Sequence, residues 1–371
     1  MKKRDAGILG TLLVVAIGIL SILFGTDLLS EFGLTEPGSE PVIEFPNPVA
    51  DEPEDWYEIY FTNPTCPPEA ERGGGIDQLV ADSFREAELR VDVAVFDLDA
   101  EPIVDALIEL EERGVQVRVV TDTDNADLSS INRLRRNGIS VVEDKRTGLM
   151  HNKFAVIDGR FTWVGSMNFT TNGAYCNNNN LVLFESPRLA ANYTAEMDEM
   201  YDNNSFGPDS LVNTPNEQLT IQGVQIENYF GPEKEIAPII ARAVARAQEA
   251  ILFMAFSFTD ERIGEAILGR ADAGVAVQGV FETTGAESDF SYYPIMRDAG
   301  IPNLEVRLDQ NPFIMHHKVI IVDWETVIFG SFNFSESANS RNDENIIIIH
   351  DPTFANFFVE EFGTVWEESG K

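Results

Sequence analysis

The chain has 371 residues, 44% of them hydrophobic and 10% aromatic, which provides for two ordinary domains with packed cores and excludes a disordered polypeptide. Its 62 acidic and 26 basic residues give a formal net charge of −36, so the surface lacks the cationic excess with which proteins hold polyanions at low salt. Acid-rich chains with few lysines are also typical of adaptation to high salt, which screens charge, and we favour that interpretation over a conclusion about the substrate.

The chain begins with a predicted membrane anchor. Basic residues at positions 2–4 precede an uncharged run, residues 6–25, and about 20 residues form a helix of roughly 30 Å, which matches one bilayer core. A cleaved signal peptide of a secreted protein is the alternative, but the run is longer than a usual signal core and no small-residue cleavage motif follows it. The basic residues before the run place the rest of the chain outside the cytoplasm. We therefore predict an anchor over residues 1–28 and an acidic, Pro-rich linker over residues 29–56.

After the linker the sequence repeats itself with an offset of about 165 residues. The segment VAVFDLDAEPIVDALIELEERGVQVRVV from Val93 corresponds to FMAFSFTDERIGEAILGRADAGVAVQGV from Phe253. In each copy, short β-branched runs alternate with amphipathic stretches, which predicts strand, helix, strand. Uniformly apolar strands joined by helices favour a mostly parallel sheet covered on both faces. We predict an α/β fold with two duplicated lobes, residues 57–215 and 216–371, each a mixed sheet flanked by helices.

Both copies carry the same polar motif, H-x-K-x4-D-x6-G-S-x-N. Its polar members are His151, Lys153, Asp158, Ser166 and Asn168 in the first copy, and His316, Lys318, Asp323, Ser331 and Asn333 in the second. Residues two apart in a strand share a face, so His and Lys project together, as do Ser and Asn. Such a face suits a phosphoryl group, because it offers a nucleophile or acid beside donors for the phosphate oxygens. The Asp and Gly positions also suit a tight turn.

The duplicated motif resembles the HKD signature of the phospholipase D superfamily, and the resemblance covers essentially everything after residue 56. The compact copies look most similar to the small cardiolipin-hydrolase and endonuclease-like branch. The resemblance implies one active site between the lobes, a covalent phosphohistidine intermediate, and no metal or other cofactor. It also implies catalytic roles for the His, Lys and Asp of both motifs, with the Ser and Asn residues supporting the substrate phosphate. One histidine attacks phosphorus and the other moves protons, and we assign attack to His151 and acid/base work to His316.

The copies differ where the family places a carboxylate that orients the histidine. Glu344 stands as far after His316 as Asn179 stands after His151. We therefore expect Glu344 to support His316 and Asn179 to support His151. A carboxylate stabilises a cationic imidazole, whereas an amide orients the ring with less charge support. The two halves are thus expected to have specialised, although the asparagines around Asn179 also suit a polar turn.

The remaining reactive side chains give weaker signals. Two cysteines, Cys66 and Cys176, would be able to pair outside the cytoplasm, and the sequence leaves a disulfide and two free thiols equally open. Neither they nor the four histidines have zinc-type spacing, so we expect no metal site. His317 and His350 are predicted to be structural.

Three functions are compatible with these observations. We favour a membrane-tethered phospholipase D-type hydrolase of phospholipid head groups, because an anchor would hold the site near its substrate. An exported, metal-independent nuclease is the second hypothesis, although the densest basic cluster, which also fits an ordinary helix face, is only Arg133, Arg135 and Arg136. A non-catalytic phosphate-binding module is the third, and two intact motifs argue against it. The expected partners are therefore a phospholipid or nucleic-acid phosphodiester and the membrane.

Overall fold

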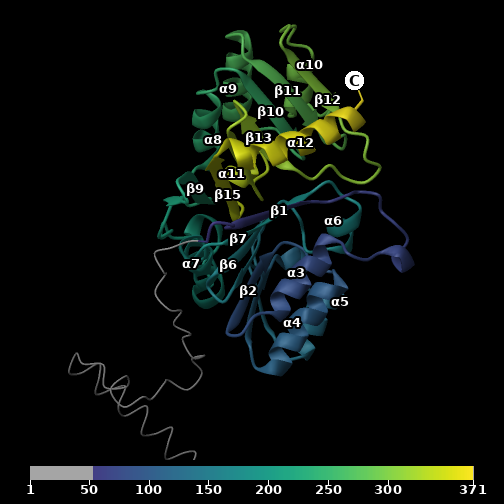
Figure 1. The fold of residues 1–371 in the computed structure, drawn as a ribbon, viewed down its shortest axis with the longest axis vertical. Coiled ribbons are helices and arrows are strands. Elements are labelled where there is room, and N and C mark those ends of the chain that lie inside the picture. The colour runs from purple at the N-terminus through teal and green to yellow at the C-terminus, as the bar shows by residue number, and fades with distance from the viewer. Residues whose placement is uncertain (1–52, 371) are drawn as a thin grey trace, which may run out of the picture. The chain divides into compact units, whose positions relative to one another are not determined.

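The computed structural model describes residues 53–370, all within one compact unit of the chain. The predicted anchor and nearly all of the predicted linker lie outside the described residues. Within residues 53–370, no helix is both long and apolar enough to cross a bilayer. The described part contains two β-sheets, one of seven strands and one of eight, and helices lie beside both (Figure 1).

The first sheet has the strand order β1-β7-β6-β5-β2-β3-β4. Its strands are β1 (Tyr57–Phe61), β2 (Arg90–Val95), β3 (Gln116–Thr121), β4 (Ser140–Glu143), β5 (Lys153–Ile157), β6 (Phe161–Gly165) and β7 (Asn180–Glu185). The helices between them are η1 (Glu69–Glu71), α3 (Ile76–Arg85), α4 (Glu101–Arg113), η2 (Thr123–Asn125), α5 (Ser129–Arg136), α6 (Thr171–Tyr175), α7 (Pro187–Asn203) and η3 (Gly207–Asp209).

The second sheet has the order β12-β11-β10-β13-β14-β15-β9-β8 and repeats the first with one added edge strand. Its strands are β8 (Gln218–Ile221), β9 (Val224–Gly231), β10 (Ala250–Ala255), β11 (Ala276–Phe281), β12 (Leu304–Leu308), β13 (Lys318–Val322), β14 (Thr326–Gly330) and β15 (Glu344–His350). The accompanying helices are α8 (Ile236–Val244), α9 (Glu261–Asp272), α10 (Tyr292–Arg297), α11 (Glu336–Ser340) and α12 (Pro352–Glu368).

Both sheets are mixed, and the expectation of mostly parallel sheets is wrong. Only β2, β3 and β4, and likewise β10, β11 and β12, pair in parallel, because helices connect them. The strands that follow each H-x-K motif pair antiparallel, since tight turns join β5 to β6 and β13 to β14. A three-residue turn reverses the chain in both hairpins, whereas a parallel connection needs a long crossover. The motif itself therefore forms an antiparallel hairpin within each sheet.

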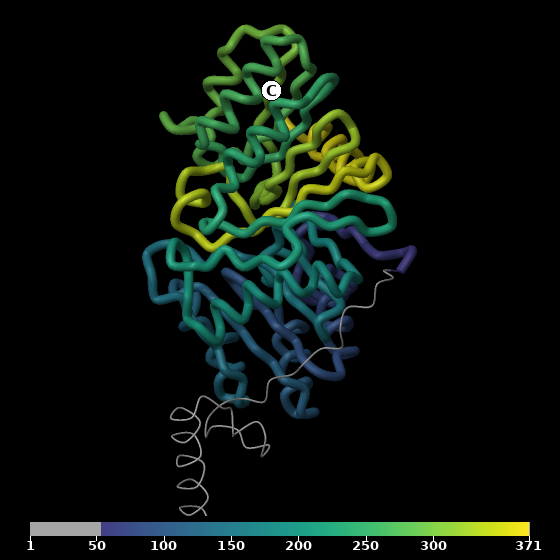
Figure 2. The backbone as a smooth tube through the Cα atoms, turned by 90° about the vertical axis from the view of Figure 1, so that its left-hand side faces the viewer, coloured from purple at the N-terminus to yellow at the C-terminus, as the bar shows by residue number. Residues whose placement is uncertain are grey.

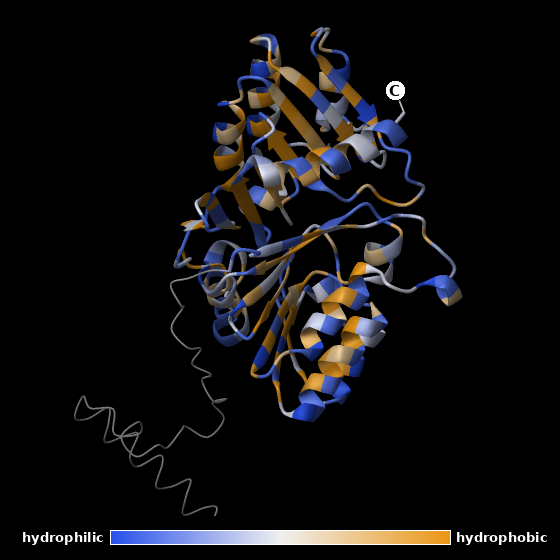
Figure 3. Ribbon diagram, in the orientation of Figure 1, coloured by the Kyte–Doolittle hydropathy of each residue, from blue (hydrophilic) through white to orange (hydrophobic). Residues whose placement is uncertain are grey.

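Three hydrophobic cores hold these layers together. The outer faces of the two sheets pack against α3, α4 and α5 in the first lobe and α8, α9 and α10 in the second. The inner faces share a single core with α7 and α12, where Phe184 and Phe329 from different sheets lie 6.5 Å apart between ring centroids. The hydropathy colouring shows strands that are mainly apolar beside helices with polar outer faces (Figure 3). Because one core includes both sheets, the two lobes form one packed body.

Short backbone bridges also link the lobes beside the H-x-K motifs. Met150 bridges to Asp343, and Met315 bridges to Asn178, each in parallel orientation. The tube in Figure 2 shows the blue and teal lobe meeting the green and yellow lobe along this boundary. Each motif therefore begins where its own strand meets a segment from the other lobe.

Candidate active site

The two H-x-K motifs occupy equivalent places in the two sheets. Lys153 begins β5 and Lys318 begins β13, with the histidine two residues earlier in each case. All four side chains are buried, with exposed fractions of 5% for His151, 0% for Lys153, 7% for His316 and 1% for Lys318. Each lysine Nζ donates to the carbonyl of its own motif's histidine, at 2.6 Å for Lys153 and 2.8 Å for Lys318. The structure thus keeps each predicted His and Lys pair together on one face.

Each histidine takes its side-chain partner from the opposite lobe. His151 Nδ1 lies 2.9 Å from Glu344 Oε2, and His316 Nδ1 lies 3.0 Å from Asn179 Oδ1. Asn179 Nδ2 donates to Gly173 O at 3.0 Å, which fixes the orientation of the amide. Since both partner oxygens accept hydrogen bonds, Nδ1 carries the proton in both rings. The Nε2 atom of each neutral imidazole is therefore left unprotonated.

The partners correct our expectation about the asymmetry. We expected Glu344 to support His316 and Asn179 to support His151, and the structure shows the reverse pairing. Glu344 begins β15 and Asn179 immediately precedes β7, and both strand ends point across the boundary between the lobes. Position in the sequence predicted that each histidine has its partner in the same copy. Because the segments that carry Glu344 and Asn179 cross the boundary between the lobes, each histidine has its partner from the other copy.

Burial dominates the electrostatics of the four groups. Desolvation lowers the pKa of His151 to about 4, although the Glu344 carboxylate opposes the shift. Desolvation and then the two lysines hold the pKa of His316 well below its ordinary value. Burial also lowers the pKa of Lys153 to about 7 and that of Lys318 well below its usual range. The site therefore concentrates groups whose charged forms an anionic ligand would stabilise.

The comparisons with known proteins agree with this geometry. Residues 80–201 and 240–366, which make up more than half of the chain, match the family described as "Cardiolipin synthase, PLD-like domain". The chain belongs to this phospholipase D-like family. The family resemblance predicted from the two motifs is thus confirmed.

Two curated relatives and one solved structure illustrate the family membership. This phospholipase D-like chain is 37% identical over 123 residues to a mitochondrial cardiolipin hydrolase of Chlamydomonas reinhardtii, a match of 33% of this chain and 55% of the relative. It is 31% identical over 169 residues to a phospholipase D of Rickettsia conorii, which covers 42% of this chain and 83% of the relative. A phosphatidylserine synthase of Haemophilus influenzae shares the fold, with a TM-score of 0.64 at 15% identity over 87% of this chain and 89% of that one.

The motif aspartates lie at the other end of their strands, away from the phospholipase D-like cluster. Asp158 accepts hydrogen bonds from the backbone N–H groups of residues 88–90 at 2.8 to 2.9 Å. Asp323 does the same for residues 248–250 at 2.7 to 3.0 Å. Both residues have a φ of 51°, which places them in the left-handed region that Asp tolerates in turns. The structure therefore does not bring these two predicted catalytic residues to the site, because each lysine begins a five-residue strand and the aspartate follows the far end of that strand.

The predicted phosphate-supporting residues divide into two kinds. Ser166 donates to Asn179 Oδ1 at 3.0 Å, and Ser331 donates to Glu344 Oε2 at 2.6 Å, so both hydroxyls hold the partners of the histidines. Asn168 and Asn333 each have a buried Oδ1 without a hydrogen-bond partner in the described part of the chain. No contact in residues 53–370 joins these two amides to the imidazoles, and their role in phosphate binding stays a prediction.

Sequence reasoning missed two phenylalanines at the site. Phe96 lies edge-on to His151 at 5.3 Å between ring centroids, and Phe256 lies edge-on to His316 at 4.9 Å. The ammonium groups lie over the same rings, at 5.5 Å for Lys153 and 4.5 Å for Lys318. Phe96 directly follows β2 and Phe256 directly follows β10, at equivalent places in the segments VAVF and FMAF. Their recurrence at the same place in the two copies was a signal that would have identified them.

The residue between His and Lys in each motif builds a buried network on the opposite strand face. Asn152 accepts from Asn345 Nδ2 at 2.7 Å, and His317 Nδ1 lies 2.9 Å from Asn180 Nδ2. His317 Nε2 also lies 3.0 Å from a carboxylate oxygen of Glu361. The contacts of His317 match the structural role that we predicted for it.

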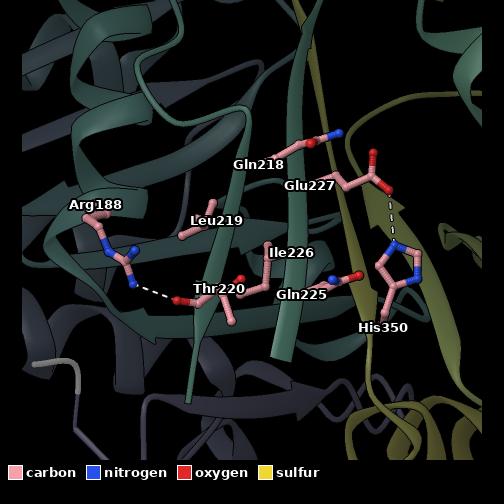
Figure 4. Close-up of a pocket in the computed structure, with 8 residues that line it drawn as sticks. All are labelled: Arg188, Gln218, Leu219, Thr220, Gln225, Ile226, Glu227 and His350. Atoms are coloured by element: carbon pink, nitrogen blue, oxygen red, sulfur yellow. Dashed lines mark hydrogen bonds and ion pairs between the residues drawn. The ribbon is translucent and has the colours of Figure 1, made fainter. Parts of the chain in front are cut away.

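Two cavities in the described part of the chain lie apart from His151 and His316. One of about 380 Å³ lies beside β8, β9 and the end of β15 (Figure 4). His350 in its lining lies 3.0 Å from Glu227 Oε1 and 3.0 Å from Thr326 Oγ1, which also fits the predicted structural role. Glu344 and His350 begin and end β15, so this cavity is about 20 Å from the site.

Two further expectations concern other ligands. In the described portion, no group of three or more His, Cys, Asp or Glu side chains is placed to hold a metal ion. In the predicted basic cluster, Arg133 pairs with the carboxylates of Glu101 and Asp105. This guanidinium lies on an ordinary helix face rather than on an open cationic stripe.

Proposed function

We propose that this chain is a metal-independent phosphodiesterase that cleaves phospholipid head groups through a covalent phosphohistidine. The observation that carries the proposal is the joint burial of two imidazoles and two ammonium groups, each imidazole held at Nδ1 by the opposite lobe. Buried cations are costly without an anion beside them. A phosphodiester supplies that anion and at the same time offers an atom that the imidazoles attack and protonate.

His151 is the nucleophile in this proposal. Its Nε2 lone pair forms a bond to phosphorus while the bond from phosphorus to the leaving oxygen breaks. The phosphorylated imidazole is cationic, and Glu344 at Nδ1 stabilises that charge. Lys153 and Lys318 hold the phosphate oxygens, because charge redistributes over these oxygens in the transition state.

His316 performs the proton transfers. The phosphodiester anion favours the protonated form of His316. Because no carboxylate stabilises this cation, it is a strong acid, and its Nε2 proton passes to the leaving oxygen as that bond breaks. The neutral ring then accepts a proton from water as the water oxygen bonds to phosphorus and the bond to His151 breaks. The amide of Asn179 orients the ring for both steps without raising its pKa as a carboxylate would.

The names of the relatives support a lipid substrate. Both the cardiolipin hydrolase of Chlamydomonas reinhardtii and the phospholipase D of Rickettsia conorii are named for phospholipid cleavage. An apolar run at residues 6–25 would tether the enzyme to the bilayer, with the site outside the cytoplasm. Tethering favours a substrate that lies in the same plane.

The deciding experiment offers the full-length protein three substrates in molar salt with EDTA. Mixed phospholipid vesicles, single-stranded DNA and double-stranded DNA are incubated in parallel, and the products are separated. Release of a lipid head group supports the proposal, whereas cleavage of DNA alone would assign the site to a nuclease. Loss of activity in EDTA that a divalent ion restores would contradict metal independence. Quenching in alkali preserves phosphohistidine, and peptide mapping is expected to find the phosphoryl group on His151.

The anchor has its own test. The full-length protein is expressed beside a variant in which a cleavable signal peptide replaces residues 1–28, so that both chains are exported. We expect the full-length protein to resist extraction by alkaline carbonate and the shortened chain to be released. Release of both forms would indicate a cleaved signal peptide or a peripheral protein.

A further inference from the structure

Each histidine strand is held by a short segment of the opposite lobe. The 176–179 segment holds the strand of His316, and the 341–344 segment holds the strand of His151. The backbone N–H of the histidine donates to a carbonyl of the segment, at 2.9 Å for His316 and 3.0 Å for His151. The last residue of each segment then reaches Nδ1 of the histidine. The position of each imidazole therefore depends on a segment from the other lobe.

The 341–344 segment is attached through charged groups. The Arg146 guanidinium pairs with the Asp343 carboxylate and also donates to Arg341 O at 3.1 Å. Asp343 is buried, with an exposed fraction of 0%. Hydrogen bonds between ionised groups are about twice as strong as those between neutral ones. Burial raises the pKa of Asp343 to about 7, so ion pairing holds the segment that positions His151 above that pH.

The 176–179 segment has only neutral contacts at the equivalent places. Asn311 stands one repeat after Arg146, and its Nδ2 donates to Asn178 Oδ1 at 2.6 Å and to Cys176 O at 3.0 Å. Amide contacts of this kind are weaker than the ion pairs of the other segment. The segment that positions His316 needs another source of rigidity.

A disulfide provides that rigidity. Cys176, the first residue of the segment, is bonded to Cys66, which is 110 residues earlier in the chain. The backbone of Cys66 donates to Tyr175 O at 2.8 Å, and Thr62 N donates to Asn179 O at 3.0 Å. Both ends of the 176–179 segment are thus attached to residues 62–66. Arg341 stands at the place equivalent to Cys176, so the charged segment has no such bond.

We infer that the Cys66–Cys176 disulfide is a positioning element that holds Asn179 against His316 and makes proton transfer at this site depend on the redox state. This inference rests on the proposed function. A dithiol reductant donates two electrons, the S–S bond breaks, and each sulfur takes a proton while the reductant forms its own disulfide. The 176–179 segment then keeps only its neutral contacts. The charged contacts that position His151 are unaffected.

The test measures two rates separately on full-length protein, before and after reduction with dithiothreitol. A nitrophenyl phosphodiester has a leaving group that needs no proton, so nitrophenolate release with enzyme in excess reports attack by His151. The decay of the phosphoenzyme is followed by quenching samples in alkali at successive times. This decay reports attack by water, which needs His316. Reduction is expected to change the first rate less than about 2-fold and to slow the second at least about 10-fold, since a misplacement of about 1 Å costs up to 10²-fold. Reoxidation is expected to restore it.

Two variants separate positioning from loss of folding. Asn311→Ala removes the amide contacts to the 176–179 segment and leaves both cysteines intact. We expect the same selective slowing of phosphoenzyme decay. Arg146→Ala is the matched change on the other segment, and it is expected to slow nitrophenolate release instead. Equal slowing of both steps on reduction, or no slowing of either, would overturn the inference. If the oxidised protein released no nitrophenolate at all, the proposed function would fail first and this inference with it.

Discussion

At the scale of single residues, charge distinguishes the two histidines. Both have a buried ring with a protonated Nδ1, a lysine two residues on and a phenylalanine against the ring. The difference is one side chain, a carboxylate beside His151 and an amide beside His316. Since a carboxylate favours the cationic imidazole, the two rings suit different steps of one reaction.

Replacing Glu344 by Gln is expected to slow phosphoenzyme formation by about 10²-fold or more, because the cationic phosphohistidine loses its counter-charge. Single-turnover nitrophenolate release measures the effect. The matched change is Asn179→Asp, which places a carboxylate at His316 and is expected to raise the pKa of that ring in an NMR titration. If Glu344→Gln slowed only phosphoenzyme decay, the roles of the histidines would be exchanged.

The pH dependence of kcat/KM on a nitrophenyl phosphodiester follows from two lowered pKa values. Burial lowers the pKa of His151 to about 4, so the neutral nucleophile forms as the pH rises through about 4 and activity rises with it. Burial lowers the pKa of Lys153 to about 7, so its positive charge is lost, and activity falls, as the pH rises through about 7. A plot of kcat/KM against pH is therefore expected to be bell-shaped, with an acid limb near pH 4 and an alkaline limb near pH 7. An alkaline limb near pH 10 would show that Lys153 titrates as an ordinary lysine.

At the scale of elements, each motif is a hairpin whose two ends have different tasks. The His and Lys stand at one end of β5 or β13, and the Asp stands in the turn at the other end. The Asp carboxylate binds three consecutive backbone N–H groups of the chain that leads into β2 or β10. It thereby fixes that loop to the hairpin turn, in both copies.

Asp158→Asn is therefore expected to act on stability rather than on chemistry. Asn tolerates the left-handed conformation, but its neutral oxygen accepts more weakly from the three N–H groups, and we expect a loss of about 1–3 kcal/mol in the free energy of unfolding. Denaturant unfolding measures the loss, and kcat/KM at a temperature where the variant is folded is expected to stay within about 3-fold of the parent value. Asp323→Asn is the matched change in the second copy. A large loss of turnover in fully folded Asp158→Asn protein would restore the catalytic role.

At the scale of the whole molecule, the formal net charge of −36 comes from 62 acidic and 26 basic residues. The His and Lys cluster is buried, while the acidic excess repels itself and any polyanion that approaches. Salt reduces this repulsion, since the Debye length shrinks from about 10 Å at 0.1 M to about 3 Å at 1 M.

Raising NaCl from 0.1 M to 2 M is expected to increase the midpoint of thermal unfolding by at least about 5 °C, because screening removes self-repulsion from the folded state. Calorimetry on full-length protein measures it. KCl at equal concentration is the control, since screening depends on ionic strength and not on the cation. An unchanged or lower midpoint would argue against adaptation to salt.

Local patterns in the sequence were enough to predict the family, the duplicated α/β lobes and the pairing of each His with its Lys. These features depend on spacing alone, because strand periodicity fixes which residues share a face. The turn role of Asp158 and Asp323 was open as an alternative, and the structure favours it through their backbone hydrogen bonds.

Only the tertiary structure decided which partner each histidine has. Equal spacing suggested that Glu344 serves His316, but the strand ends cross between the lobes, and Glu344 contacts His151 instead. The sequence also left the state of Cys66 and Cys176 open, and the fold joins them beside the segment that holds His316. Contacts between residues far apart in the chain depend on how the lobes pack, and no local period encodes that packing. The motifs therefore identify the candidate site, whereas the different partners of its two histidines depend on the interface between the lobes.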